Sequence, residues 1–141
     1  MRTPDANLLL YAIDPDSRHH RVAREWLEEA LSGSDTVGFA WAVLLAVLRL
    51  TTNPAVFDPA LEPDSALDLI DGWLERPGSV VLHPTDRHPQ LLRSLLADSG
   101  AAGNLTSDAH LAAIAIEHGA TLASFDGDLH RFAGLKLEFL R

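Results

Sequence analysis

Helical and strand-like patterns of apolar and polar residues alternate along this chain of 141 residues. Residues 18–31 repeat apolar side chains every three or four positions, which predicts an amphipathic helix. Residues 41–51 are apolar nearly all round, which is typical of a helix buried against a sheet. By the same criteria, helices are expected over residues 6–12, 18–31, 41–51, 63–75, 87–98 and 107–118. Strands are expected over residues 1–5, 36–39, 79–82, 121–125 and 136–140.

This order of elements predicts an α/β fold. Strands that are separated by helices pair in parallel, because each crossover helix packs on the sheet. We therefore expect a central, mainly parallel sheet of four to five strands with helices on both faces. No linker, repeat or low-complexity tract interrupts the pattern, so residues 1–141 are expected to form a single domain.

Composition narrows the class of protein. Apolar residues make up 47% of the chain, which is enough for a sizeable core. The absence of cysteine excludes disulfides, zinc–thiolate sites and thiol catalysis, and it suits a reducing cytoplasm. No apolar run approaches the roughly 20 residues that a membrane span needs. The N-terminal residues MRTPDAN do not resemble a signal peptide, and we expect a cytoplasmic protein.

The formal net charge of −9 argues against a protein that binds nucleic acid by bulk electrostatic attraction. It does not argue against an enzyme that meets nucleic acid at a site where a metal supplies the positive charge.

Three aspartates fall where a strand ends or a helix begins: Asp5, Asp108 and Asp126. Such positions converge on one edge of a parallel sheet, where ligands commonly bind. Clustered carboxylates repel one another unless a divalent cation neutralises them, and hard oxygen ligands suit Mg²⁺ or Mn²⁺. The pattern therefore indicates a metal-dependent phosphodiesterase pocket.

Each acid also has a purely structural interpretation. Asp5 could cap the helix that follows it, and the charge of Asp108 suits the first turn of a helix. Asp126 and Asp128 flank a glycine in a sequence that is typical of turns. The shared edge of the sheet, rather than any single residue, favours the metal site.

Four segments resemble the PIN-domain ribonucleases, particularly the VapC-type toxins of bacterial toxin–antitoxin pairs. They are DANLLLYA at residues 5–12, WAVLLAVLRLTTNP at 41–54, GNLTSDAHLA at 103–112 and SFDGDL at 124–129. The resemblance implies an α/β/α sandwich whose acids hold Mg²⁺ or Mn²⁺ and cleave RNA. It also implies an antitoxin partner that blocks the site, and a homodimer.

Carried over by position, the resemblance makes Asp5, Asp108 and Asp126 the catalytic metal ligands, with Asp128 in support. Four polar neighbours could orient water or ligands, or could equally be turn and cap residues: Asn7, Asn104, Ser107 and Ser124. Arg49 could pair with a pocket acid or bind phosphate, and its alternative is a buried ion pair.

One position departs from the family pattern. Family members usually carry a glutamate three residues before the position of Arg49, and here that residue is Ala46. This departure motivates an alternative, in which a catalytically weakened PIN-like domain only binds a partner through Trp26, Trp41 and Trp73.

In the nuclease interpretation, a cation held by Asp5 and Asp108 would neutralise the attacked phosphate and lower the pKa of a bound water. Whether one ion or two would bind stays open.

Two further readings are weaker. The segment DGD at residues 126–128 resembles the aspartyl nucleophile motif of phosphatases, and acidic clusters also mark receiver domains. Both classes need a lysine at the phosphate, and Lys136, the only lysine, is expected at the opposite end of the strands. Of the seven histidines, His110 and His118 are spaced too widely for a zinc site and are expected at the surface or at helix ends.

Overall fold

A five-stranded parallel sheet forms the centre of the molecule in the computed structural model, which describes residues 1–99 and 103–141. The strand order is β3-β2-β1-β4-β5, and every neighbouring pair is parallel. The strands are β1 (Arg2–Pro4), β2 (Val37–Ala40), β3 (Ser79–Leu82), β4 (Thr121–Ser124) and β5 (Lys136–Phe139). The expectation of a mainly parallel sheet of four to five strands is confirmed.

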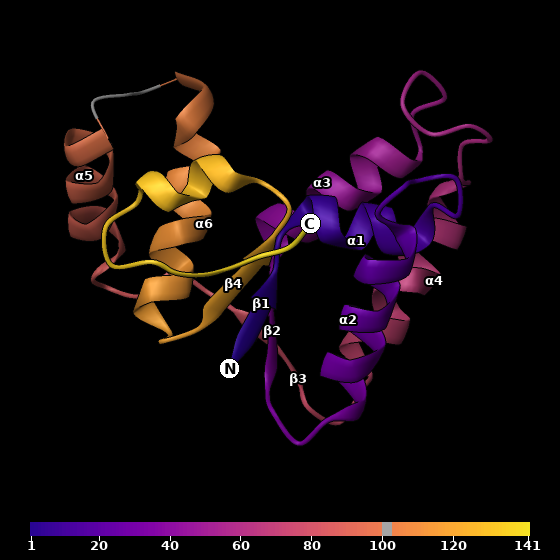
Figure 1. The fold of residues 1–141 in the computed structure, drawn as a ribbon, viewed down its shortest axis with the longest axis horizontal. Helices are drawn as coiled ribbons and strands as arrows, with labels where there is room; N and C mark the ends of the chain where they lie inside the picture. The colour runs from indigo at the N-terminus through magenta and orange to yellow at the C-terminus, as the bar shows by residue number, and fades with distance from the viewer. Residues whose placement is uncertain (100–102) are drawn as a thin grey trace.

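Helices cover both faces of this sheet, which confirms the three-layer α/β/α arrangement. Figure 1 shows α5 and α6 on one side and α1, α2, α3 and α4 on the other. Their bounds are α1 (Ala6–Ile13), α2 (His20–Ser32), α3 (Trp41–Thr51), α4 (Pro63–Leu74), α5 (His88–Ser99) and α6 (Thr106–Glu117). Two short 3₁₀ helices, η1 (Gly103–Leu105) and η2 (Gly127–Arg131), precede α6 and follow β4. None of the described helices has the length and apolar character that crossing a bilayer requires.

The shortest strand lies at the centre of the sheet. β1 has only three residues, including a proline, and its intrinsic strand propensity is poor. It is placed by pairing with β2 on one side and with β4 on the other, where Thr3 lies opposite Leu122. Its burial between two strands therefore outweighs its weak propensity, and it brings the N-terminal segment into the middle of the fold.

Side chains from both helical layers meet the sheet in one core. Phe39, Leu44 and Leu122 are completely buried, and Ile114 is 2% exposed. Trp26 and Trp73 belong to this core and are 4% and 9% exposed, so of the three tryptophans considered for partner binding only Trp41 lies at the surface.

The structure corrects the sequence-based boundaries and burial in three places. α3 is not buried all round, because Trp41 and Leu45 are 43% and 55% exposed on its outer face. α2 begins at His20, two residues later than expected, and η2 was not predicted. Residues 100–102, which follow α5, lie outside the described part of the chain.

Candidate active site

Two strand ends and one helix start supply the acids of the site. Asp5 directly follows β1 and caps α1 through a 2.7 Å hydrogen bond from the backbone N–H of Ala6 to its Oδ1. Its own backbone N–H donates to the carbonyl of Ala123 in β4 at 2.9 Å. Asp126 lies two residues beyond β4, and Asp108 lies in the first turn of α6. Capping and site formation are therefore compatible roles for Asp5.

Asp5 and Asp108 line the same hollow, which has a volume of about 160 Å³. α6 adds Ser107 and Leu111 to the lining of this hollow, and Ala6, the residue after Asp5, also lines it. The wall contributed by α3 contains no polar side chain, since it consists of Ala42, Val43 and Ala46. The position where the family usually has a glutamate thus lies in the hollow beside the two acids. We call it the acidic hollow below.

A buried serine connects the acids from the end of β4. Ser124 is fully buried, and its hydroxyl donates to Oδ2 of Asp5 at 2.7 Å. Oγ of Ser124 also accepts from the backbone N–H of Asp126 at 3.0 Å and from Nδ2 of Asn7 at 3.1 Å. Oδ1 of Asn7 accepts from the backbone N–H of Phe125 at 3.2 Å. These bonds fix the orientation of the Asp5 carboxylate, so Ser124 and Asn7 position it rather than line the hollow.

The electrostatics of the site favour a cation. The pKa of Asp5 lies above its ordinary value, mainly because the carboxyl group is buried and also because of the negative charge of Asp126. Hydrogen bonds from Ser124 and Ala6 lower this pKa but do not outweigh the burial. The pKa of Asp108 is also raised, first by burial and then by the charges of Asp5 and Asp126, while Arg131 opposes the shift. The charge of Asp126 therefore makes ionisation of both acids more costly, the charge of Asp5 does the same for Asp108, and a bound divalent cation would remove that cost.

The donor set fits a hard divalent cation with few protein ligands. Within residues 1–99 and 103–141, no three His, Asp or Glu side chains gather closely enough to hold one ion. Mg²⁺ characteristically uses one or two carboxylates and takes its remaining ligands from water and substrate phosphate. Asp5 and Asp108, which share the acidic hollow, match that preference.

The other residues expected at the site occupy different places. Oδ1 of Asp126 accepts from the backbone N–H of Asp128 at 2.9 Å and so caps η2, and Asp128 itself is exposed. Ser107 lines the acidic hollow. The Arg49 side chain is exposed and forms no ion pair within the described part of the chain, so the buried ion pair considered for it is wrong. The side chain of Asn104 lies outside the described part of the structure.

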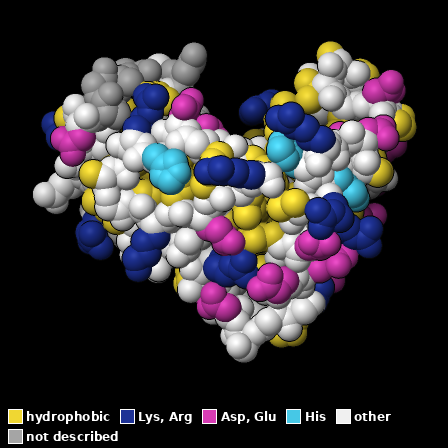
Figure 2. All heavy atoms as spheres, viewed as in Figure 1, with side chains coloured by type: hydrophobic (Ala, Val, Ile, Leu, Met, Phe, Trp, Pro, Cys, Tyr) yellow, Lys and Arg dark blue, Asp and Glu magenta, His cyan; other side chains and the backbone are white. Residues whose placement is uncertain are grey.

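One cation near the acids was missed from the sequence. Arg131, the last residue of η2, is exposed, and its Nε donates to the carbonyl of Asp128 at 3.2 Å. Its charge lowers the pKa of Asp108. By contrast, Arg21 and Arg24 on α2 pair with glutamates one turn away, and Figure 2 shows cationic and acidic side chains intermingled over that helix. The unpredicted 3₁₀ helix is why Arg131 escaped notice.

The histidines of α5 and α6 form a separate cluster. Nδ1 of His88 donates to the Glu117 carboxylate at 2.7 Å, and its Nε2 lies 2.9 Å from Nδ1 of His110. His88 is 9% exposed, so it is a buried residue between helices. The expectation of surface or helix-end positions holds for His118, which caps α6, and not for His110.

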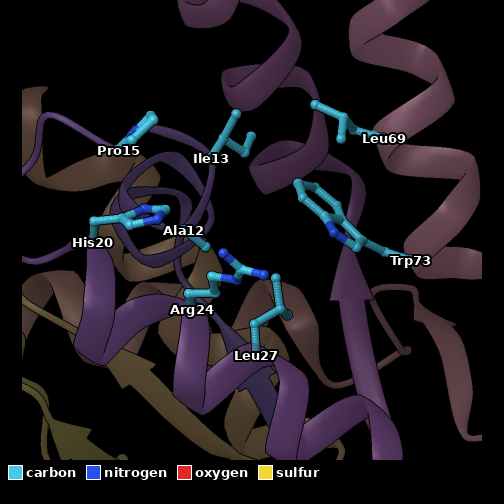
Figure 3. A pocket seen from close by; sticks show the side chains of 8 residues that line it. All are labelled: Ala12, Ile13, Pro15, His20, Arg24, Leu27, Leu69 and Trp73. Carbon is cyan, nitrogen blue, oxygen red and sulfur yellow. The ribbon is translucent and has the colours of Figure 1, made fainter.

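A second hollow lies between α1, α2 and α4 (Figure 3). It has a volume of about 400 Å³ and is mainly apolar. Figure 3 shows Leu69 and Trp73 of α4 facing Arg24 and Leu27 of α2 across it, with Ile13 at the end of α1. None of the acids of the active site lines it. We call it the helical pocket.

Lys136 is placed as the sequence predicted. It opens β5 and lies opposite Thr121, the first residue of β4, whereas Asp126 follows the other end of β4. A lysine at that end of the strands cannot contact a phosphate held by the acids. The lysine that phosphatases and receiver domains need at the phosphate is therefore not provided by Lys136.

Comparison with known proteins agrees with this architecture. Residues 3–135 match the PIN domain family. The chain is 45% identical to ribonuclease VapC37 of Mycobacterium tuberculosis over 136 residues, which cover 96% of this chain and 94% of that protein. It is 37% identical to ribonuclease VapC43 of the same organism over 94% of this chain and 90% of that one.

Solved structures share the fold at lower identity. VapBC2 from Rickettsia felis, bound to a promoter DNA fragment, matches with a TM-score of 0.72 and 20% identity over 98% of this chain and 97% of that one. VapBC-1 from nontypeable Haemophilus influenzae matches with a TM-score of 0.70 and 16% identity over 98% and 96%. From its match across the domain and its identity to curated relatives, the chain belongs to the PIN-domain family, among the VapC ribonucleases.

Proposed function

We propose that this protein is a metal-dependent endoribonuclease and the toxin of a toxin–antitoxin pair, with residues 1–141 acting as one domain in the cytoplasm. The observation that carries the proposal is the pair Asp5 and Asp108, which line one hollow and whose pKa values are both raised, first by burial and also by the charge of Asp126. Membership of the VapC ribonucleases supports RNA as the substrate. The donor set supports Mg²⁺ or Mn²⁺ as the cofactor.

The residues of the site divide the work. A bound ion supplies positive charge for the scissile phosphate and acidifies a water molecule. Asp5 and Asp108 hold the ion, and Ser124 keeps the Asp5 carboxylate in a fixed orientation through its 2.7 Å hydrogen bond. Asp126, whose charge acts on both other acids, accepts the proton of the attacking water. Asn7 and the backbone of β4 keep these groups together.

Cleavage of whole RNA in Mg²⁺, Mn²⁺ or EDTA tests this proposal directly. We expect cleavage by the wild type in either metal, none in EDTA, and none by Asp5→Ala or Asp108→Asn, while both variants keep their circular dichroism spectra. Asp71→Asn, an exposed position on α4, is the matched control and should cleave normally. A folded Asp108→Asn protein that cleaves at the wild-type rate would contradict the proposed site.

The partner we propose is an antitoxin that binds the helical pocket and reaches the acidic hollow. The structural neighbours include VapBC complexes, and the helical pocket offers a mainly apolar seat on a different part of the surface from the acids. An arginine of the antitoxin would pair with Asp5 and Asp108 in place of the ion. Mn²⁺ and the antitoxin should therefore compete, and Leu69→Arg in the helical pocket should weaken antitoxin binding without abolishing cleavage.

We also propose that the chain forms a homodimer, which analytical ultracentrifugation tests.

Ala46 motivates the second candidate function, a PIN-like module that binds a partner and cleaves nothing. Calorimetry with Mn²⁺ separates the two functions, because only the nuclease should bind the ion and lose that binding in Asp108→Asn.

A further inference from the structure

The acidic hollow has ligands on two sides and none on the third. On the basis of the proposed function, we infer that the acidic hollow holds a single divalent ion between Asp5 and Asp108. Ala46 on α3 stands at the position from which a further carboxylate would otherwise reach that ion. The sequence alone leaves open one ion or two, and the composition of the walls decides between them.

The charge inside the hollow balances one ion. Asp5 and Asp108 are the only carboxylates among the residues that line it, and together they carry two negative charges when ionised. One divalent cation neutralises them, and Asp126, whose charge reaches both acids, does not line the hollow and so offers a second ion no ligand there. In two-metal nuclease sites the ions lie about 3.5–4 Å apart, and such pairs need several carboxylates because cations repel at that separation.

The remaining acids do not supply the missing ligands. Neither Asp126 nor Asp128 lines the acidic hollow. Oδ1 of Asp126 accepts a hydrogen bond from the backbone N–H of Asp128 at 2.9 Å. Asp128 itself is exposed to solvent. Across the described residues, no group of three potential ligand side chains comes within reach of one ion, and a pair of ions would need more than three.

α3 faces the acids with a wall that cannot ligate a metal. Ala42, Val43 and Ala46 are its contribution to the hollow, and none carries an oxygen or nitrogen on its side chain. Ala46 is half-buried, so a longer acidic side chain at this position would extend into the same volume as Asp5 and Asp108. The neighbouring residue Leu45 is 55% exposed on the outer face of the helix, and it offers a matched position of the same helix outside the hollow.

Titration of the metal-free protein with Mn²⁺, followed by calorimetry and by electron paramagnetic resonance, tests the inference without measuring cleavage. We expect about one Mn²⁺ per chain and a spectrum free of coupling between ions. Two ions per chain with Mn–Mn coupling would overturn the single-ion inference and leave the nuclease proposal standing. No Mn²⁺ binding at all would overturn both.

A second experiment introduces a carboxylate at position 46 and measures its effect on Mn²⁺ affinity. Ala46→Glu should bind Mn²⁺ about tenfold more tightly than the wild type, because affinity rises with the number of charged ligands. Leu45→Glu adds the same charge one residue away on the outer face and should change the affinity much less. Ala46→Asp, with a shorter side chain, serves if the glutamate variant unfolds. Equal affinities for the variants at positions 45 and 46, measured on folded proteins, would show that Ala46 does not face the ion.

Discussion

Ser124 and Asp5 are 119 positions apart in the chain, and the hydroxyl of the first donates to Oδ2 of the second at 2.7 Å. The bond joins the end of β4 to the end of β1, the two strands that pair side by side at the centre of the sheet. The orientation of the Asp5 carboxylate therefore depends on a residue that does not line the acidic hollow.

Removing this hydroxyl should weaken catalysis without removing an acid. Ser124→Ala is expected to slow RNA cleavage by about 10-fold, which is typical for residues that orient metal ligands, and to cost about 1–2 kcal/mol of stability because Asn7 and Asp126 lose an acceptor. The hydrogen bond from Ser124 lowers the pKa of Asp5, so the acid limb of the pH–rate profile should move to higher pH. Ser107→Ala, at an exposed serine of the hollow, is the control and should not move that limb.

Asp108 should destabilise the metal-free fold at neutral pH. Because its pKa is raised above 3.8 in the folded state, the folded protein holds this proton more tightly than the unfolded chain. The associated stability is present below 3.8 and is lost as the pH rises through the folded pKa. Asp108→Asn should therefore melt at a higher temperature than the wild type in EDTA at neutral pH, and the difference should close in acid.

Metal should reverse this order. Adding Mn²⁺ should raise the melting temperature of the wild type and leave that of Asp108→Asn unchanged, whereas Asp71→Asn should respond like the wild type. A variant that melts below the wild type in EDTA would show that burial and repulsion do not dominate at Asp108.

Arg131 should bind the RNA backbone near the acids. In a chain of net charge −9, substrate affinity must come from local cations, and the charge of Arg131 already acts on Asp108. Arg131→Gln should raise KM several-fold with little change in kcat and should reduce the salt dependence of single-stranded RNA binding by about 0.7 in log–log slope. Arg131→Lys should restore part of the affinity. Arg93→Gln, an exposed arginine on α5, should behave like the wild type in the same fluorescence anisotropy titrations.

Glu117 should matter for stability and not for cleavage, because it accepts hydrogen bonds from the hydroxyl of Thr85 at 2.6 Å and from Nδ1 of His88 at 2.7 Å. Burial alone would raise the pKa of Glu117, but hydrogen bonds from Thr85 and His88 outweigh it, and the net pKa is lowered below 4.5. The stability that this carboxylate contributes is therefore present above 4.5 and is lost as the pH falls through its folded pKa. Glu117→Gln should cost about 1–2 kcal/mol in urea unfolding at neutral pH, with a smaller difference in acid. Glu75→Gln, an exposed glutamate, should show neither effect.

The alternation of patterns was enough to predict the layers and the parallel sheet, because strands and helices of this length differ clearly in their apolar period. The central position of β1 could not be read from its three residues, since its place depends on the partners that flank it. The exposure of Trp41 and Leu45 was missed for a similar reason: an apolar helix does not reveal which of its faces the fold leaves uncovered.

At the site, the order of strands led to the expectation that Asp5, Asp108 and Asp126 lie at one edge, and Asp5 and Asp108 share a hollow. The separate role of Ser124 as the hydrogen-bond centre could not be predicted, because a serine after a strand is equally a turn residue. Arg131 was missed because its position depends on η2, a 3₁₀ helix that has no clear sequence period.

The position of β1 between β2 and β4 has a consequence during synthesis of the chain. β1, which Asp5 directly follows, lacks its second neighbour until β4 has been made as far as Ser124. A nascent chain, or one truncated before β4, therefore contains the first acid without the groups that orient it.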